Sequence, residues 1–246
     1  MSWKPPNSVL EAGFEHAAQC APLESCGLVI DGAYHPVTNQ ADERDYFTMS
    51  PREYAGLQTQ HGPAAAIVHS HVYHNDVASL ADQASCEKFE LPWLILAWPN
   101  RTYRVIEPCG FRAPLLGRPW AWGTFDCYGL VRDAYRYLAG IALPDFDREW
   151  GWWEHGENLI FEGFGHAGFA PLAPGAAFQN LDVVICQIRA RVPNHCGVWL
   201  PGDMLLHQLA GRPSTREPYG GFYKDTTVLH VRHKALDGKA LPEIGL

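Results

Sequence analysis

The chain has 246 residues, of which 47% are hydrophobic and 19% are charged, and its formal net charge is −8. This composition supports folded cores and argues against an intrinsically disordered chain. The negative charge and the lack of any run of lysine or arginine argue against a nucleic-acid-binding groove, so we expect no nucleic-acid partner.

No stretch of the sequence reaches the roughly 18 apolar residues of a membrane helix, so we expect no membrane insertion. Residues 1–16 lack the apolar core of a signal peptide. The seven cysteines form no Cys-x-x-Cys pair, and their number is odd. These features indicate reduced thiols in a protein made in the cytoplasm, without a cysteine-rich zinc module.

The first predicted element is a helix over residues 7–22, with Ser8 as its N-cap. Its apolar face consists of Val9, Leu10, Phe14 and Ala17. A β-hairpin is predicted over residues 25–37, with Asp31-Gly32 as its turn.

Strands and helices alternate in the segments that follow. We expect a buried strand over residues 64–71, a helix over 78–91, and two strands on either side of Pro99-Asn100. This alternation predicts an α/β or α+β unit of about 110 residues.

A domain boundary is predicted within residues 109–119, which contain two glycines, two prolines and no apolar periodicity. We therefore expect one domain over residues 1–110 and a second over 111–246. In the second domain a strong helix is predicted over residues 126–140, followed mostly by strands, and this order indicates an α+β fold.

Two histidines stand near the polar end of the strand over residues 64–71. Because alternate side chains of a strand share a face, His69 and His71 point in the same direction and can fill two positions of a tetrahedral metal. Asp82, in the first turn of the next helix, is a candidate third ligand. Such a set leaves the fourth position open, as in catalytic zinc sites, and Glu24 upstream is the candidate general base.

Each part of this pattern also has a simpler interpretation. A His-x-His pair alone is weak evidence for a metal. A Ser-x-x-Asp segment, here Ser79 to Asp82, alone usually forms only a helix cap. His74 fits no position of the pattern, and we expect it to be a surface loop residue.

Taken together, these residues resemble the JAMM (MPN-domain) metallopeptidase motif, in which a glutamate precedes His-Ser-His, seven residues and Ser-x-x-Asp. The residues that carry the resemblance are Glu24, His69, Ser70, His71, Ser79 and Asp82. It implies a mixed sheet with flanking helices and a Zn²⁺ ion held by His69, His71 and Asp82. It also implies that Glu24 activates water and that Ser79 helps to stabilise the oxyanion of an attacked amide. Val72 stands where the family often has proline, which should affect the loop more than ligation.

Cys127 stands at the start of the helix predicted over residues 126–140. The apolar face of this helix consists of Leu130, Val131, Ala134, Tyr135 and Leu138. The dipole of a helix stabilises a thiolate at its N-terminus and lowers the thiol pKa. A nucleophilic cysteine also needs a histidine base held by a third polar group. The simpler interpretation is a small buried apolar residue.

His195 and His207 are the candidates for the base and for the group that holds it. They lie on either side of Pro201-Gly202-Asp203, at the start of one predicted strand and the end of the next. If the turn has three residues, His207 faces Gly197, diagonal to His195 on the same face; a two-residue turn would put the histidines on opposite faces. Cys196 should point to the other face, so we do not expect it to be the nucleophile.

This second set resembles the NlpC/P60 cysteine peptidases, in which an aromatic-x-Trp-Gly segment and Asp-Cys precede a helix, a strand histidine and a third polar residue. The residues that carry the resemblance are Trp120, Ala121, Trp122, Gly123, Asp126, Cys127, His195 and His207. The resemblance implies a papain-like α+β domain. It implies that Cys127 attacks, that His195 acts as base and then as acid, and that His207 orients the imidazole.

The second set departs from that family at three positions. Trp120 replaces the usual tyrosine upstream of the cysteine and has no hydroxyl for an oxyanion role. Tyr128 stands where serine is frequent, and Asp182 follows Asn-Leu where Gly-Asp is usual. We expect these changes to leave the core chemistry in place and to affect substrate specificity.

A JAMM-like domain followed directly by an NlpC/P60-like domain is similar to the tail assembly K family of long-tailed phages. The resemblance covers nearly the whole chain and implies a tail-tip peptidase. Its C-terminal domain would cut peptide stems of peptidoglycan during DNA entry, beside a γ-glutamyl–diamino acid linkage. Its N-terminal domain would be a zinc peptidase of unknown target. The implied locations are the host cytoplasm during assembly and then the virion tail tip, with other tail-tip proteins as partners.

Two alternatives remain open. The first is a structural tail-tip component with vestigial peptidase sites, an interpretation that the replacement at Trp120 favours. The second is a cellular deubiquitinase-like enzyme, which rests on the N-terminal motif alone and leaves Cys127 unexplained.

Overall fold

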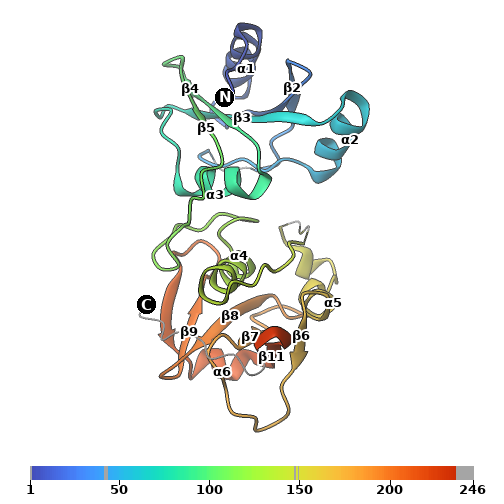
Figure 1. Cartoon of the computed structure of the whole chain (residues 1–246), viewed down its shortest axis with the longest axis vertical. Coiled ribbons are helices and arrows are strands. Elements are labelled where there is room, and N and C mark those ends of the chain that lie inside the picture. Colours follow the sequence, from blue (N-terminus) through green and yellow to red (C-terminus); the bar gives the residue numbers. More distant parts are fainter. Residues whose placement is uncertain (1, 42–43, 147, 149, 237–246) are drawn as a thin grey trace. The chain divides into compact units, whose positions relative to one another are not determined.

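The computed structural model describes residues 2–41, 44–146, 148 and 150–236 (Figure 1). The chain divides into two compact units, residues 1–112 and residues 113–246. Among the described residues, none of the helices combines the length and the apolar character needed to span a bilayer.

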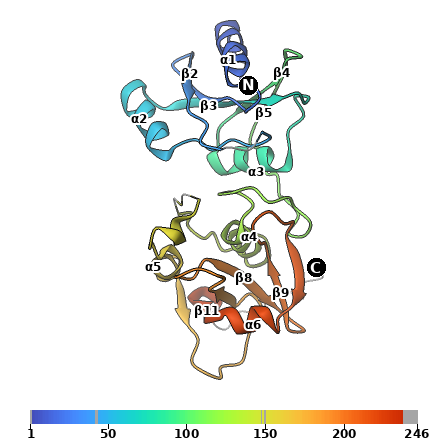
Figure 2. The same ribbon diagram turned by 180° about the vertical axis from the view of Figure 1, so that it is seen from behind.

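The first unit is built on a five-stranded sheet with the strand order β2-β1-β3-β4-β5. Strands β3 and β4 are parallel and the other neighbours are antiparallel, so the sheet is mixed. Helix α1 lies on one face, and α2 and α3 lie on the other (Figures 1 and 2). The elements are α1 Asn7–Cys20, β1 Cys26–Ile30, β2 Ala33–Val37, α2 Pro51–His61, β3 Ala64–Val72, α3 Leu80–Phe89, β4 Trp93–Trp98 and β5 Thr102–Ile106.

Side-chain alternation along β3 divides the core of the first unit into two layers. Ala66 and Val68 pack with Val9 and Phe14 of α1 on one face of the sheet. Ile67 faces the opposite layer, where Cys86 of α3 is buried. By the same period of two, His69 and His71 point to the side of the sheet that carries α2 and α3.

The secondary-structure elements predicted for this unit are present, with two exceptions. Asp31 and Gly32 both have positive φ, at 48° and 75°, as the two central residues of a type I′ hairpin turn require. The prediction of Ser8 as the N-cap is wrong: α1 begins at Asn7 and Pro6 occupies the cap position. The predicted elements also did not include α2, which Ser50 caps by accepting a hydrogen bond from the backbone N–H of Glu53.

The second unit is built on a six-stranded antiparallel sheet with the order β10-β9-β8-β7-β11-β6. Helices α4 and α5 pack against a large apolar core on one face, and Tyr223 of α6 packs on the other. A π-helical segment, Tyr135–Ala139, continues α4. The elements are α4 Cys127–Ala134, α5 Leu159–His166, β6 Phe169–Pro171, β7 Val183–Cys186, β8 His195–Leu200, β9 Met204–His207, β10 Thr215–Pro218, α6 Phe222–Thr226 and β11 Thr227–His233.

The α/β and α+β fold class predicted from the sequence is confirmed. The predicted helix is present as α4 with its π-helical extension, and its predicted face is buried in the core. Strands make up most of the elements after this helix, as predicted, and two helices that were not predicted, α5 and α6, interrupt them. Both are short segments of eight and five residues, and neither begins with a side-chain cap that marks a helix start in the sequence.

Candidate active sites

Three candidate metal ligands of the first unit meet at one point. The Nε2 atoms of His69 and His71 lie 3.1 Å apart. Each faces one carboxylate oxygen of Asp82, at 3.2 Å from His69 and 3.3 Å from His71. All three residues are buried or half-buried. The structure therefore brings together the three side chains that the sequence predicted as metal ligands.

This geometry fits a tetrahedral zinc ion. Zinc bonds of 2.0–2.1 Å to nitrogen place neighbouring ligand atoms about 3.3–3.4 Å apart in a tetrahedron. The three measured separations, 3.1 to 3.3 Å, are close to this edge length. Two imidazoles and one carboxylate are also a donor set that zinc accepts, and they leave a fourth position for water or substrate.

Secondary contacts hold the histidine rings in place. His71 directs its Nδ1 atom to the backbone oxygen of Asn75 at 2.8 Å, which leaves Nε2 free to act as a ligand. The His69 ring stacks on Phe47, with centroids 4.8 Å apart, and meets the edge of Trp93 at 5.3 Å. Both rings are therefore oriented by contacts that do not depend on the candidate metal.

Ser79 and Asp82 form the helix cap that the simpler interpretation predicts. The Ser79 hydroxyl accepts a hydrogen bond from the Asp82 backbone N–H, and the Asp82 carboxylate accepts one from the Ser79 N–H. The capping box fixes the Asp82 carboxylate beside the histidines. Burial favours the neutral acid, but the two histidines outweigh it and hold the pKa of Asp82 well below its usual range.

Glu24 lies on the neighbouring strand end, beside this cluster. Cys26 pairs with His69 across β1 and β3, so Glu24, two residues earlier, comes opposite His71. Ser25 fixes this arrangement by exchanging hydrogen bonds with Ser70. The Glu24 side chain is buried, and burial raises its pKa to about 8. A carboxyl group with a raised pKa can both accept and release a proton near neutral pH.

In the second unit, Cys127 is the first residue of α4, and Asp126 caps that helix. The Asp126 carboxylate accepts hydrogen bonds from the backbone N–H groups of Gly129 at 2.7 Å and Gly123 at 2.9 Å. Arg148 forms a buried ion pair with the same carboxylate at 2.8 Å. This network fixes the start of α4, and with it the position of the thiol.

His195 and His207 lie in direct contact. Gly197 pairs with His207 across β8 and β9, as the three-residue turn predicts. His195 Nε2 and His207 Nδ1 are 3.1 Å apart, which leaves His195 Nδ1 for the thiol of Cys127. Burial, with the charge of His195 as a smaller cause, lowers the pKa of His207 to about 3, so this ring is neutral at pH 7.

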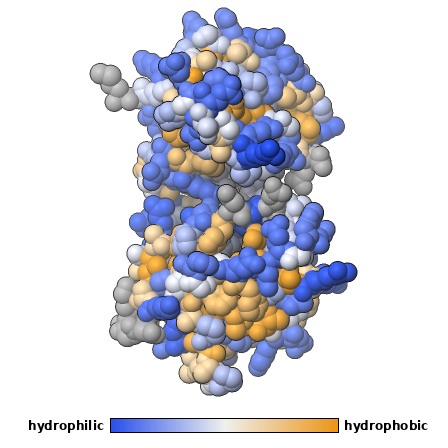
Figure 3. All heavy atoms as spheres, turned by 90° about the vertical axis from the view of Figure 1, so that its right-hand side faces the viewer, coloured by the Kyte–Doolittle hydropathy of each residue, from blue (hydrophilic) through white to orange (hydrophobic). Residues whose placement is uncertain are grey.

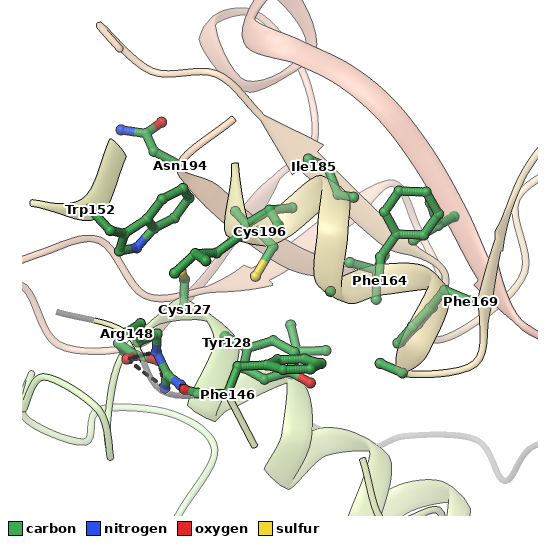
Figure 4. Close-up of a pocket in the computed structure, with 18 of the residues that line it drawn as sticks. Cys127, Tyr128, Phe146, Arg148, Trp152, Phe164, Phe169, Ile185, Asn194 and Cys196 are labelled. Carbon is green, nitrogen blue, oxygen red and sulfur yellow. Dashed lines mark hydrogen bonds and ion pairs between the residues drawn. The ribbon is translucent and has the colours of Figure 1, made fainter. Parts of the chain in front are cut away.

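The thiol of Cys127 has a partner that the sequence did not indicate. Cys196 shares the α4 side of the sheet with Val198 and Leu200, and its thiol lies beside Cys127 (Figure 4). A hydrogen bond from Cys196 and, to a smaller extent, His195 hold the pKa of Cys127 well below its ordinary value, against the opposing effect of burial. The pKa of Cys196 is raised in turn, so Cys196 is the protonated donor.

A second unpredicted residue near this site is Glu217. The Nε2 atom of His207 is buried and has no hydrogen-bond partner within ordinary distance. The nearest carboxylate oxygen belongs to Glu217 on β10, at 3.9 Å, and Glu217 also accepts a hydrogen bond from Tyr223. No local sequence pattern marks Glu217 as a site residue, because β10 comes close to His207 only through its pairing with β9.

The three departures from the NlpC/P60 pattern have different structural roles. The Trp120 ring packs against the rings of Trp122 and Trp150. Asp182 is fully buried in an ion pair with Arg232 and serves the fold. Tyr128 lines a cavity beside Cys127 and donates its hydroxyl hydrogen to the backbone oxygen of Pro144.

Comparison with known families matches both parts of the chain. The NlpC/P60 family matches residues 117–232, and the prokaryotic homologues of the JAB domain match residues 6–106. The tail tip assembly protein K of Escherichia phage N15 is 38% identical over 236 residues, which cover 93% of this chain and 96% of that protein. The corresponding protein of Escherichia phage lambda is 34% identical over 80% of this chain and 94% of its own length. A solved NLP/P60-family protein from Staphylococcus aureus is 13% identical, with a TM-score of 0.36, over 91% of this chain and 61% of that one.

Proposed function

The chain belongs to the tail tip assembly protein K family, and on this premise we propose that it is a tail-tip peptidase with two separate hydrolytic sites. The observation that carries the proposal is the series of contacts from Cys127 to His195 and from His195 to His207. It supplies a thiol with a lowered pKa, a base beside it and a neutral group that orients the base, the three parts that a thiol peptidase needs.

The reaction at Cys127 follows from these contacts. The thiolate attacks the carbonyl carbon of the peptide bond, while the proton held by His195 passes to the nitrogen of the leaving amine. The C–N bond breaks and leaves a thioester on Cys127. His195 then takes a proton from water, which hydrolyses the thioester and releases the acid. His207 accepts the Nε2 hydrogen of His195 throughout and keeps Nδ1 directed at the thiol.

We assign peptidoglycan stem peptides as the substrate of this site and DNA entry as the stage at which it acts. The family premise supports this assignment, since a tail tip is the part of a phage that meets the cell wall. The chain would join other tail-tip proteins in the host cytoplasm and then remain at the virion tail tip.

In the first unit, His69, His71 and Asp82 would hold a zinc ion. Zinc would supply a Lewis acid that polarises a carbonyl group and makes water nucleophilic near neutral pH. Glu24 would take the proton from water and give it to the leaving amine, and the Ser79 hydroxyl would donate to the oxyanion. This site would be a peptidase or isopeptidase, and its target bond is open.

The proposal is tested by incubating the protein with purified muropeptides and separating the products by mass spectrometry. Wild type is expected to release shortened stems, and Cys127→Ala is expected to release none while retaining its fold. Metal analysis of the same preparations should give about one zinc ion per chain. Muropeptides left intact by a folded wild-type protein would contradict the thiol peptidase assignment.

A structural role at the tail tip is the second candidate, and Trp120 is the observation that favours it. Its indole stands where the NlpC/P60 pattern has a hydroxyl, and it packs against two other tryptophans. A purely structural role predicts that phage carrying Cys127→Ala remain infectious, whereas the peptidase role predicts a loss of infectivity.

A further inference from the structure

Glu217 and His207 lie on neighbouring strands, β10 and β9, at one edge of the six-stranded sheet. Thr215 pairs with His207, so Glu217, two residues further along β10, shares a face of the sheet with that ring. One carboxylate oxygen of Glu217 is 3.9 Å from the Nε2 atom of His207. A carboxylate therefore stands beside the outer nitrogen of the ring that orients His195.

His207 has to carry its hydrogen on Nε2 if it is to orient His195. In the proposed reaction, Nδ1 of His207 accepts the Nε2 hydrogen of His195 across 3.1 Å. Burial lowers the pKa of His207 to about 3, so the ring is neutral at pH 7 and has a single hydrogen. That hydrogen must lie on Nε2, which is buried and has no hydrogen-bond partner among the described residues. Because an unpaired buried N–H is unfavourable, the other tautomer competes unless a neighbouring group favours this one.

Tyr223 of α6 holds the Glu217 carboxylate in a position to favour it. The Tyr223 ring packs on the His207 ring, with centroids 4.6 Å apart, and its hydroxyl donates to the second carboxylate oxygen of Glu217 at 3.3 Å. The first oxygen is left facing Nε2 of His207, and a shift of about 1 Å would bring it to ordinary hydrogen-bond distance. A negative charge beside Nε2 favours the tautomer that carries its hydrogen there.

We propose that Glu217 is a positioning residue of the thiol site, which acts by holding His207 in the Nε2–H tautomer. The inference rests on the proposed function in taking Cys127 and His195 as the reacting pair. With Nδ1 of His207 as an acceptor, His195 can carry hydrogens on both nitrogens when it pairs with the Cys127 thiolate. In the other tautomer, Nδ1 of His207 carries a hydrogen, and the doubly protonated His195 would direct a second hydrogen at it. Glu217 therefore favours the thiolate through two imidazoles, without contacting the substrate.

The tautomer is measured directly by nitrogen NMR of the full chain labelled at its histidine side chains, which requires no peptide turnover. The resonances of His207 are those that disappear in His207→Asn. In wild type at pH 7 we expect His207 as the Nε2–H tautomer. Glu217→Ala removes the carboxylate, so the His207 shifts should move toward those of the Nδ1–H form. Glu217→Asp keeps a carboxylate and should retain more of the Nε2–H form than Glu217→Ala does.

Alkylation of Cys127 by iodoacetamide gives a second readout, because its pH midpoint reports the thiolate. Loss of the Nε2–H tautomer disfavours the thiolate, so in Glu217→Ala the lowered pKa of Cys127 should rise and the midpoint should move to higher pH. Removal of a negative charge acting through space alone would move the midpoint down, so the direction identifies the tautomer effect. With muropeptides, kcat should fall on the order of 10-fold with little change in KM, and Glu217→Asp should recover part of it.

The matched control is Glu162→Ala, which removes an exposed glutamate near the opposite edge of the sheet. Glu162 lies on α5, which contacts the edge strand β6, and this side of the unit faces the viewer in Figure 3. We expect this variant to match wild type in tautomer, alkylation midpoint and kcat. Thermal unfolding of each variant establishes that it is folded.

The outcomes separate this proposal from the proposed function. A His207 tautomer that is the same in wild type and in folded Glu217→Ala would overturn the positioning role, as would a midpoint that stays in place or moves down. Equal effects of Glu217→Ala and Glu217→Asp would also overturn it, because the carboxylate would then not be responsible. A change of tautomer in a protein that cleaves no peptide would support the role of Glu217 and contradict the peptidase function. Cleavage with an unchanged tautomer would do the reverse.

Discussion

The two candidate sites bring their reactive atoms together in different ways. In the first unit, one strand and the first turn of the next helix supply His69, His71 and Asp82, and their ligand atoms lie 3.1 to 3.3 Å apart around one point. In the second unit, the N-terminus of α4 supplies the thiol of Cys127. Strands β8 and β9, more than 60 residues later in the sequence, supply the imidazoles of His195 and His207. His195 contacts the thiol, and His207 contacts His195. The first arrangement is suited to holding a cation, whereas the second can act with protein groups alone.

This difference predicts that the two sites respond to different perturbations. Metal removal should affect only the first unit, and thiol chemistry only the second. Four predictions follow from the comparison of the two sites, from the largest expected effect to the smallest.

The nucleophile should be the most sensitive position. Cys127→Ala removes the atom that forms the covalent intermediate, so we expect peptide cleavage to fall by on the order of 10⁴-fold or more. Zinc content should remain at its wild-type value. Parallel assays of cleavage and bound metal measure both effects, and a loss of zinc in this variant would show that the sites are coupled.

The second largest effect is expected on zinc affinity when a candidate metal ligand of the first unit is removed. His69→Ala and Asp82→Ala each remove one of three protein ligands, so we expect zinc affinity to fall at least 100-fold. His74→Ala is the matched control, because His74 is exposed and lies outside the ligand cluster. Metal analysis after dialysis measures the effect. Full zinc occupancy in the Asp82→Ala variant would contradict the assigned ligand set.

Substitution of His207, the residue that orients His195, should lower the rate of cleavage by a smaller factor. His207→Ala leaves His195 without its partner at Nε2, and we expect kcat to fall on the order of 10²-fold with little change in KM. His207→Asn should restore part of kcat, because an amide oxygen can accept the same hydrogen. His166→Ala, on the exposed surface of α5, provides the control. An unchanged kcat in His207→Ala would remove this residue from the mechanism.

The smallest predicted effect is a shift of pH dependence. The hydrogen bond from Cys196 lowers the pKa of Cys127, so the thiolate persists to lower pH than for an ordinary cysteine. Cys196→Ala removes this donor, so the pKa of Cys127 should rise and alkylation of Cys127 should begin to slow at higher pH than in wild type. The pH profile of alkylation measures the midpoint, and Cys20→Ala, in the first unit, is the control. A midpoint that stays in place or moves down would contradict the role of Cys196.

The sequence predicted the features that depend on local periodicity. The period of two along β3 placed His69 and His71 on one face, and the residue types Asp31-Gly32 indicated the hairpin turn. The register of Gly197 with His207 followed only for a three-residue turn, and the structure decides between the two turn lengths that the sequence left open. These features need only neighbouring residues and the geometry of a strand. The face of His69 and His71 and the turn at Asp31-Gly32 are therefore readable without knowledge of the tertiary structure.

Features that depend on contacts between distant segments were not predicted. Cys196 reaches Cys127 because the N-terminus of α4 packs over β8, and no local pattern specifies that crossing. Arg148 reaches Asp126 from a loop, again through tertiary packing. The cavity beside Cys127 exists only once α5 has packed on the sheet, and α5 itself lacks a capping signal.

The most direct test of two independent sites is mass spectrometry of peptidoglycan fragments after incubation with four samples. These are wild type, Cys127→Ala, His69→Ala, and wild type treated with a zinc chelator. We predict new stem-peptide cuts in wild type, in His69→Ala and in the chelated sample, and none in Cys127→Ala. Loss of the cuts in the chelated and His69→Ala samples, with the fold intact, would contradict the account, because the thiol site would then depend on the metal site.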